Sequence, residues 1–569
     1  MNAAIVALLC AAIFIVAQRL YGRFLSKRVF VVDERATTPA HALRDDLDYV
    51  PAPPPVLFGH HFASIAGLGP IIGPAIAVIW GWVPALIWMM LATIFIGAVH
   101  DMGSLIVSVR HNAYSVGDIA KQVISSRARV LFLAFIFFAL SLAMGVFVFF
   151  IAKLFAPPPE GGWSVPQAVF PSVALIVLAV TIGLLRQIYK VNLTILTVVG
   201  FVLMMIAVVI GVYMPVTSFF GITLTQSRWS YILLAYAFIA SVLPVWLLLQ
   251  PRDYLNAFQL YLGMGLLFLG ILVWHPSISA PAFNRNVPDP KPIFPLLFIT
   301  VACGAISGFH SLVSSGTTAK QLDKEPHALP IAYGAMLAEG MLAVIALLVC
   351  SAALGGYADW VKHYPSHQYA GNHGLLNFVA GASAVLAHLG IPSETAKVFV
   401  ATVAVSFALT TLDSATRLLR YNVEELSRSV GLKILANRYA SCLIAVAAIG
   451  FFALLRVKGK PVGLLLWQLF GASNQLLAAL ALLTITLYLH MTGRPAIFTG
   501  LPMVLVTFIT GAALLLNLVN FWRDQNWVLF VVDACLLALA IWLIGEAIAT
   551  VMKRSTAQRK ALIAHEGRD

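Results

Sequence analysis

Five titratable side chains lie within apolar stretches of this sequence, where an ionisable group is costly and usually serves a function. They are His60 and His61 in FGHHFASIAGLGP, Asp101 in GAVHDMGSL, His310 in SGFHSLVSSG and Glu339 in AMLAEGMLAV. Histidine titrates near physiological pH, and a lone buried carboxylate must be protonated or paired. The pattern predicts a site that binds and releases protons. For the histidine pair, binding of a substrate carboxylate and a structural hydrogen bond remain alternatives.

His100 directly precedes Asp101, and a carboxylate beside an imidazole can share a proton with it. Adjacent residues of a helix point to different faces, however, so the two side chains need not touch. Coupling to a proton and a structural pairing of Asp101 with a nearby arginine are both open.

Hydroxyl side chains follow His310 and could bind a cation. Ser314, Ser315, Thr317 and Thr318 stand in HSLVSSGTTAKQL, and hard cations prefer oxygen ligands. Serine and threonine also satisfy helix backbones without any ligand, so sodium is the alternative to the proton. The ligand types of His60, His61 and His310 suit zinc, but no spacing supports a metal site and none is predicted.

Two charged pairs stand at the ends of apolar runs. Asp413 and Arg417 are four residues apart in TTLDSATRLL, which favours an ion pair on one helix face. Arg252 and Asp253 follow Pro251 in QPRDY and are expected to cap a span. All four charged residues are gating candidates.

Glycine and proline interrupt three of the apolar stretches, and an interrupted helix frees backbone groups for a ligand. The first break holds Gly67 and Gly69, both candidate substrate-site residues; the second holds Pro244; the third follows Gly304. The positive end of a half-helix attracts an anionic group. The first break is therefore predicted to receive a carboxylate.

The composition requires a membrane. Of 569 residues, 60% are hydrophobic and only 10% are charged, and the mean hydropathy is +0.91. A soluble domain carries about 25% charged residues. The net charge of +13 lies in short loops, as the positive-inside rule expects, so it does not indicate nucleic acid. The five cysteines form no disulfide or metal pattern.

Fifteen apolar runs are long enough to cross a bilayer. They are residues 2–21, 56–80, 82–110, 129–154, 167–186, 191–213, 230–249, 255–274, 295–319, 330–354, 393–415, 437–455, 462–490, 497–519 and 527–551. The distribution of Lys and Arg places the N-terminus outside and the C-terminus in the cytoplasm, with 371–390 interfacial or re-entrant. We expect an uncleaved first span, a short helix with Ser115 as its N-cap in 111–128, and contact with membrane lipids.

The predicted fold is an all-α integral membrane protein with a LeuT-like core of two inverted five-helix repeats and broken helices. The predicted divisions are residues 1–55 (first span and cytoplasmic lead-in), 56–229 (first repeat), 230–416 (second repeat with a 355–392 insertion), 417–436 (amphipathic cytoplasmic helix) and 437–569 (four accessory spans and tail). The second and seventh spans would begin the two repeats, with the ninth span also lining the site.

Six stretches resemble the carbon starvation protein A (CstA) family of bacterial membrane transporters. They are FGHHFASIAGLGPIIGPAIA, GAVHDMGSLIVSVRHNAYSVGDI, SVLPVWLLLQPRDYL, ACGAISGFHSLVSSGTTAKQL, TTLDSATRLLRY and LWQLFGASNQLLAALALL. They occur in order and cover most of the chain. The resemblance implies an inner-membrane transporter of peptides or pyruvate, linked to nutrient limitation, with an amino acid–polyamine–cation type core.

A secondary transporter is therefore the expected function, by proton symport in preference to sodium symport. The sequence contains no GxxxxGK[ST], HExxH or GxSxG motif, so neither ATP hydrolysis nor another enzyme activity is predicted, and no cofactor is expected. A nutrient sensor or receptor is the other class, although the sequence has no sizeable soluble output domain. Asn474 and Gln475 are expected to hydrogen-bond between helices.

Overall fold

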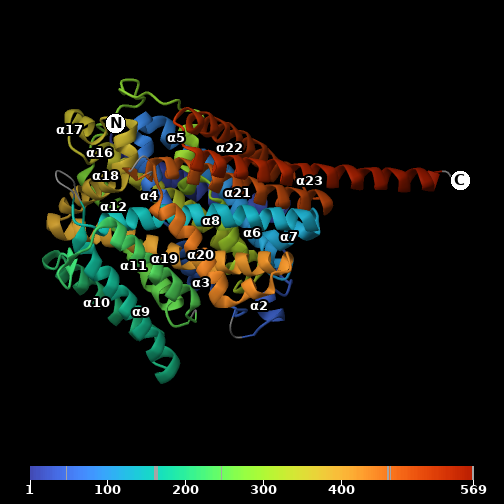
Figure 1. The fold of residues 1–569 in the computed structure, drawn as a ribbon, viewed down its shortest axis with the longest axis horizontal. Helices are drawn as coiled ribbons and strands as arrows, with labels where there is room; N and C mark the ends of the chain where they lie inside the picture. The colour runs from blue at the N-terminus through green and yellow to red at the C-terminus, as the bar shows by residue number, and fades with distance from the viewer. Residues whose placement is uncertain (46–47, 159–163, 245, 458–459, 462, 567–569) are drawn as a thin grey trace.

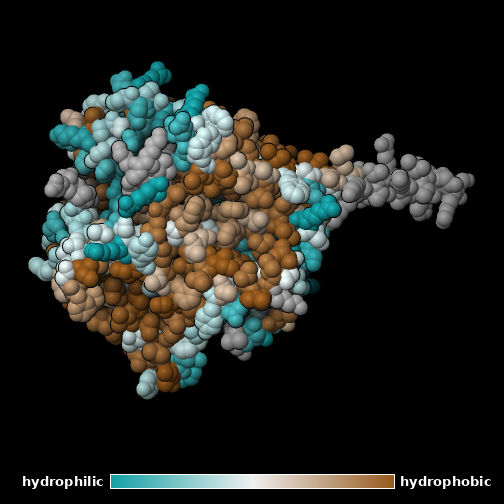
Figure 2. Space-filling view, in the orientation of Figure 1, coloured by the Kyte–Doolittle hydropathy of each residue, from teal (hydrophilic) through white to brown (hydrophobic). Residues whose placement is uncertain are grey.

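The computed structural model describes residues 1–569 except 46–47, 159–163, 245, 458–459, 462 and 567–569. Its described part consists almost entirely of helices packed side by side, and the long C-terminal α23 projects from the body (Figure 1). Figure 2 shows apolar side chains over the middle of the visible face, with hydrophilic residues gathered toward its upper left and right margins. The visible face therefore presents an apolar middle, as expected of a surface that lies against lipid.

The first half of the chain forms twelve α-helices and one small hairpin. Their bounds are α1 Ala3–Ala17, α2 Pro39–Ala42, α3 Pro54–Ile65, α4 Gly69–Ala77, α5 Trp82–Ala92, α6 Ala98–Val109, α7 Val116–Val123, α8 Ser126–Phe155, α9 Val169–Tyr189, α10 Leu193–Tyr213, β1 Ser218–Phe219, β2 Ile222–Thr223, α11 Gln226–Val242 and α12 Leu249–Trp274. β1 pairs antiparallel with β2.

The second half is built in the same way. Its elements are α13 Leu296–Thr300, α14 Ala302–Ala305, α15 Gly308–Gly316, α16 Gly334–Ala352, α17 Tyr357–His363, α18 His367–Ala387, α19 Ser393–Ser429, α20 Arg438–Leu454, β3 Arg456–Val457, β4 Lys460–Pro461, α21 Gly463–Met491, α22 Ile497–Arg523 and α23 Trp527–Glu566. β3 and β4 form a second antiparallel pair.

Eleven helices of the described part are long and apolar enough to cross a membrane, or up to twelve if the bent pair α3–α4 counts as one span. The eleven segments are Ala3–Val29, Trp82–Val109, Ser126–Phe155, Pro166–Tyr189, Thr194–Tyr213, Leu249–Trp274, Glu325–Ala352, Ser393–Ser429, Leu466–Met491, Ile497–Arg523 and Trp527–Met552. The protein is thus a multi-pass helical membrane protein. Of the other expected spans, 230–249 and 437–455 correspond to helices of 17 residues, α11 and α20.

The first predicted break is present between α3 and α4, which meet at 49°. Pro70 lies in the first turn of α4, and a proline there starts a helix well but cannot continue the preceding one. Gly73 brings α4 close to the α13–α14 junction, because a Cβ at Gly73 would lie 2.6 Å from the Thr300 carbonyl oxygen. The two interrupted segments therefore pack directly on each other.

The interruption expected after Gly304 is confirmed in α13–α15, because Ile306 and Ser307 are extended between α14 and α15, just before the turn that carries His310. The break expected in the seventh span is not found among the described residues. The expectation that 230–249 is one broken span is wrong, because α11 ends at Val242 and a new helix, α12, begins at Leu249. Pro244 lies in the linker between two separate helices.

Two further expectations can be compared with the helices. Residues 416–436 do not form a separate amphipathic helix, because α19 runs without interruption from Ser393 to Ser429 and a short 3₁₀ turn follows. The predicted helix within 111–128 is confirmed as α7, and the Ser115 hydroxyl accepts a hydrogen bond from the Asp118 N–H, as expected for an N-cap.

Candidate functional site

A chain of four buried titratable side chains connects α6, α15 and α16. We call it the relay cluster: His100, Asp101, His310 and Glu339. Asp101 Oδ1 lies 2.7 Å from His100 Nδ1, and its Oδ2 lies 2.8 Å from His310 Nδ1. On the other side of the ring, His310 Nε2 lies 3.2 Å from Glu339 Oε2. The two histidines and two carboxylates are thus in continuous contact, and none is more than 1% exposed.

The relay cluster is incompletely hydrogen-bonded. His100 Nε2 and both oxygens of Glu339 have no hydrogen-bond partner, and the His310–Glu339 contact lacks hydrogen-bond geometry. A buried charge is expensive unless it is paired and hydrogen-bonded. Four coupled groups with spare donor and acceptor positions can change their number of protons and redistribute the charge among themselves.

The structure brings together three of the five titratable residues singled out in the sequence: Asp101, His310 and Glu339. His100 joins them, because its side chain turns back onto its neighbour. No arginine pairs with Asp101 among its contacts in the structure, which are with the two histidines.

His60 and His61 lie on α3, before the first break, and have different surroundings. His61 is fully buried and its Nδ1 lies 2.8 Å from Thr318 Oγ1, while its Nε2 has no partner. His60 is partly exposed, and its Nδ1 lies 3.4 Å from Asp253 Oδ2 on α12. The adjacent histidines therefore face different helices.

The hydroxyls after His310 are mostly bound to their own helix. Ser315 donates to the Ser311 carbonyl at 2.7 Å, and Thr317 donates to the Val313 carbonyl at 3.0 Å. Ser314 is fully buried, and its hydroxyl has no hydrogen-bond partner. Within the described residues, no group of three or more His, Cys, Asp or Glu side chains is placed to hold a metal ion.

A small cavity of about 20 Å³ lies between the two broken helices. Gly67 and Gly69 line it from the first break and Ser307 lines it from the second. Thr411 of α19 also lines it, and its hydroxyl is buried without a hydrogen-bond partner. The volume accommodates a water molecule but not a nutrient, so the centre of the protein is closed.

Asn474 of α21 supports the second break. Its amide nitrogen donates to Ser307 Oγ at 3.0 Å, and its amide oxygen accepts from the Phe309 N–H at 3.0 Å. Gln475 donates to the Phe298 carbonyl at 2.8 Å. The prediction that both amides hydrogen-bond between helices is confirmed. In a continuous helix the Phe309 N–H would donate to a carbonyl of the preceding turn. At the break, Asn474 provides the acceptor for it.

The second buried charged cluster joins α11, α12 and α19. We call it the clamp cluster: Tyr236, Arg252 and Asp413. The Arg252 guanidinium donates to Asp413 Oδ2 and to the Tyr236 hydroxyl, and Tyr236 donates to Asp413 Oδ2 at 2.7 Å. Arg252 and Asp413 are fully buried. The opposite charges are therefore directly compensated.

The clamp cluster overturns two expectations. Asp413 does not pair with Arg417, which donates to the Ala240 and Leu243 carbonyls at the end of α11. Arg252 does not cap the seventh span, because it lies in the first turn of α12 and points to α19. The spacing of four residues allowed the first pairing, but a fully buried arginine on another helix competes better for the carboxylate.

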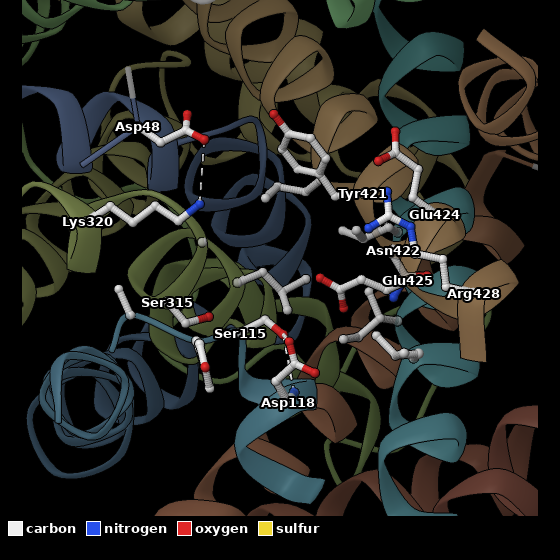
Figure 3. A pocket seen from close by; sticks show the side chains of 18 of the residues that line it. Asp48, Ser115, Asp118, Ser315, Lys320, Tyr421, Asn422, Glu424, Glu425 and Arg428 are labelled. Atoms are coloured by element: carbon white, nitrogen blue, oxygen red, sulfur yellow. Dashed lines mark hydrogen bonds and ion pairs between the residues drawn. The ribbon is translucent and has the colours of Figure 1, made fainter. Parts of the chain in front are cut away.

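A larger cavity of ≈ 340 Å³ opens at the α7 end of the molecule, and we call it the vestibule (Figure 3). Ser315 lines it from α15, Asp118 from α7, and Glu424 and Glu425 from α19. Its basic residues are Lys320 and Arg428, as labelled in Figure 3. The volume is within the range of small-molecule sites. Among its labelled residues, Ser315 is a candidate site residue from the sequence, and Ser115 is the expected N-cap of α7.

The lead-in before α3 is bound to the vestibule rim and the adjoining 322–327 segment. Asp48 lies 4.0 Å from Lys320, whose ammonium also lies over the Tyr49 ring. Burial and the neighbouring charge of Asp48 raise the pKa of the Tyr49 phenol. In the 322–327 segment, Glu325 accepts a hydrogen bond from the Arg110 guanidinium at 2.5 Å, and this bond connects the 322–327 segment to the end of α6. The lead-in is thus part of the packed structure, not a free linker.

Sequence reasoning missed Tyr236 and the pairing of Arg252 with Asp413, because the partners are distant in the chain. Tyr236 and Arg252 meet Asp413 across intervals of 177 and 161 residues. The vestibule acids Glu424 and Glu425 did have a signal, the charged stretch RYNVEELSR after an apolar run. That stretch was interpreted as the polar face of a separate surface helix.

Comparison with known proteins finds one family model over nearly all of the chain. The model of the carbon starvation protein CstA matches residues 2–362 and 361–513. The "Peptide transporter CstA" of Escherichia coli is 34% identical over 559 residues, covering 87% of this chain and 78% of the relative. That of Bacillus subtilis is 33% identical and covers 92% and 91%.

A relative with a different name also matches. The "Pyruvate/proton symporter BtsT" of Escherichia coli is 32% identical over 552 residues, covering 84% of this chain and 76% of the relative. Among solved structures, a manganese transporter mutant of Eremococcus coleocola aligns with 90% of this chain and 98% of its own, at a TM-score of 0.47 and 14% identity. On the extent of the family match and of these relatives, the chain belongs to the carbon starvation protein CstA family.

Proposed function

We propose that this protein is a secondary active transporter that imports a small carboxylate-bearing nutrient together with protons. Relatives in the same family are named as a peptide transporter and as a pyruvate/proton symporter. Peptides and pyruvate each carry a carboxylate, and the proposed substrate is one of these two. The observation that carries the proposal is the relay cluster, a protonatable chain held between three helices beside the interrupted segments.

The substrate carboxylate would bind at the central cavity. The N-terminal ends of α4 and α15 both border it, and helix N-termini present N–H groups and a partial positive charge. The unpartnered hydroxyl of Thr411 supplies a further donor at the same place. Because this cavity is closed to a nutrient while the vestibule is open, the structure fits one state of an alternating-access cycle.

Packing supports a core of two five-helix repeats, with a division different from the one expected. We propose α3–α4, α5–α6, α8, α11 and α12 as the first repeat, and α13–α15, α16, α19, α20 and α21 as the second. Three packing contacts occur in equivalent form in both repeats. The contact of α4 with α16 corresponds to that of α15 with α6, and the contact of α3 with α12 corresponds to that of α15 with α21. The contact of α12 with α19 corresponds to that of α21 with α8. α9 and α10 would be an insertion in the first repeat.

The remaining topology follows from this proposal. The interrupted segment α13–α15 and the helices α11 and α20 would also cross the membrane, giving fifteen spans with the bent pair α3–α4. The vestibule end would face the cytoplasm of a bacterial inner membrane. The N-terminus would lie outside and the C-terminus inside, since that arrangement leaves most Lys and Arg on the cytoplasmic side. Arg252, Asp413 and Arg417 would hold α11, α12 and α19 together throughout the cycle without opening or closing the path, and Asp253 would remain beside His60 of α3.

Uptake by the purified protein in liposomes tests the proposal. Labelled pyruvate and labelled dialanine would be offered with an inward proton gradient and, separately, with an inward sodium gradient at equal pH. We expect accumulation of one of them under the proton gradient alone. Accumulation that requires the sodium gradient would show that sodium, and not the proton, is the coupling ion. Absence of uptake under both gradients would contradict the transporter proposal for these substrates.

A further inference from the structure

From two facing rows of hydroxyls we infer a proton path that connects the relay cluster with the vestibule through Ser104 and Ser314. The inference deepens the proposed function and rests on it. It concerns α6 and α15, which carry hydroxyls at the positions that follow Asp101 and His310. A proton that leaves the relay cluster must cross the packed interior, where these hydroxyls are the polar groups on both helices.

The two helices run in the same direction, and their polar residues meet at two levels. Asp101 of α6 contacts His310 of α15 at 2.8 Å, and further along Ser108 contacts the Ser315 carbonyl oxygen at 3.5 Å. Seven residues of α-helix extend about 10 Å, which is the length of the path along α6. Ser315 lines the vestibule, so the far end of the two rows reaches the cavity.

Ser104 and Ser314 lie between these two contacts. Ser104 follows Asp101 by three residues and precedes Ser108 by four, so it shares their helix face. Ser314 follows His310 by four residues and shares its face in the same way. Ser104 therefore lies on the face of α6 that meets α15. Ser314 lies on the face of α15 that meets α6.

The hydroxyls of Ser104 and Ser314 differ from their neighbours in having no partner. Ser104 is 2% exposed and Ser314 is fully buried, yet neither makes a hydrogen bond. Ser311 and Ser315, by contrast, donate to carbonyls of their own helix, at 2.7 Å in both cases. A buried polar group without a partner costs free energy and requires an explanation.

Proton transfer explains these two hydroxyls. A serine hydroxyl accepts one hydrogen bond while it donates another, so it can take a proton from one side as it releases its own to the other. With Ser104 and Ser314 uncommitted, a chain from Asp101 and His310 forms by rotation about their side-chain bonds or through an interposed water. Only a proton moves along this chain, and it leaves at Ser315, which lines the vestibule.

The test uses full-length protein in liposomes with two measurements on each variant. Net uptake of labelled pyruvate or dialanine driven by a proton gradient requires that protons leave the site in every cycle. Exchange of internal for external substrate at equal pH does not, because the site can remain protonated. The variants are Ser104→Ala, Ser314→Ala and their combination, and Ser311→Ala is the matched control, since it removes a neighbouring hydroxyl that is already bound to its own helix.

We expect net uptake by the double variant to fall about ten-fold, as for loss of a proton-transfer group, while exchange stays close to wild type. Ser311→Ala should change neither rate. Wild-type net uptake by the double variant would overturn the path, and so would an equal loss of uptake and exchange, which would assign the hydroxyls to substrate binding or folding. If wild type itself shows exchange but no proton-driven uptake, the proposed function fails together with the path.

Discussion

The relay cluster and the clamp cluster are both buried, both charged and both assembled from helices distant in sequence, yet they differ in how their charges are matched. In the clamp cluster one arginine meets one carboxylate with a tyrosine hydroxyl on the same oxygen. In the relay cluster two carboxylates alternate with two imidazoles. Both clusters contain side-chain atoms without a hydrogen-bond partner, such as Arg252 Nε in the clamp cluster and His100 Nε2 in the relay cluster, so they differ in the kind of charged group that they contain.

This difference separates a structural role from a functional one. Arginine stays protonated under all ordinary conditions, so the clamp cluster holds a permanent cation beside Asp413, and we expect its loss to destabilise the protein. Imidazoles and carboxylates can exchange protons with one another, so the four side chains of the relay cluster can hold their protons in several arrangements. We therefore propose that the clamp cluster docks helices and that the relay cluster carries protons.

The largest effect is expected from breaking the clamp cluster on one side. Arg252→Met leaves Asp413 buried without its cation, which should destabilise the protein by about 3–5 kcal/mol. Thermal unfolding in detergent would measure the loss. The double variant Arg252→Met with Asp413→Leu removes both charges and should recover most of the stability, because an apolar pair of similar volume commonly replaces a buried ion pair without loss.

If the double variant were as unstable as the single one, the ion pair would not be the source of the stability. If it were stable but unable to transport, the clamp cluster would take part in the cycle and the assignment of roles would be wrong.

The relay cluster should respond in activity more than in stability. Asp101→Asn retains the size and hydrogen-bonding capacity of the side chain but cannot take up a proton in the same way. We expect proton-driven uptake to fall by about a hundred-fold, the size of a lost acid–base group. Substrate exchange and the unfolding temperature should remain near wild type. A variant that unfolds easily but transports normally when folded would reverse the two roles.

Asn474→Ala is expected to have an intermediate effect on stability. The amide satisfies Ser307 and the Phe309 N–H at the second break, and loss of a buried hydrogen-bond partner costs about 1–3 kcal/mol. Thermal unfolding should show a decrease smaller than that for Arg252→Met. Gln475→Ala is the neighbouring control for loss of one inter-helix bond. Equal stability of Asn474→Ala and wild type would show that the break needs no support from α21.

The smallest effect is expected from His60→Gln. His60 is 18% exposed and meets Asp253 without a hydrogen bond, and a glutamine amide can donate to the same carboxylate. Because the contact lacks a hydrogen bond and glutamine keeps a donor at the same place, proton-driven uptake should stay close to wild type. A complete loss of proton-driven uptake with exchange preserved would place His60 in the proton route and extend the relay beyond its four residues.

The sequence was informative where local chemistry determines the structure. The first break could be predicted because glycine and proline stand together at Gly67, Gly69 and Pro70, and α7 because Ser115 is a good N-cap. The second break was also expected near Gly304, and the extended backbone lies two residues further on, at Ile306 and Ser307. What the sequence could not report is its support by Asn474 from another helix.

Pairings between helices were beyond the sequence for a related reason. Periodicity places Asp413 and Arg417 on one helix face, but it cannot include Arg252, which lies on a helix that packs against that face. Asp101 and His310 were each recognised as candidates because each is ionisable in an apolar run. Their contact across 209 residues follows from the parallel packing of α6 and α15, which no local pattern reports.

Movement of protons with substrate is the most direct test of the relay cluster. The protein would be placed in liposomes at equal internal and external pH, and a pH-sensitive dye would follow the external medium after addition of pyruvate or dialanine. We predict that wild type and the Arg252→Met/Asp413→Leu variant make the medium more alkaline as protons enter with substrate, and that Asp101→Asn does not. Proton uptake by Asp101→Asn at the wild-type rate would contradict the central claim.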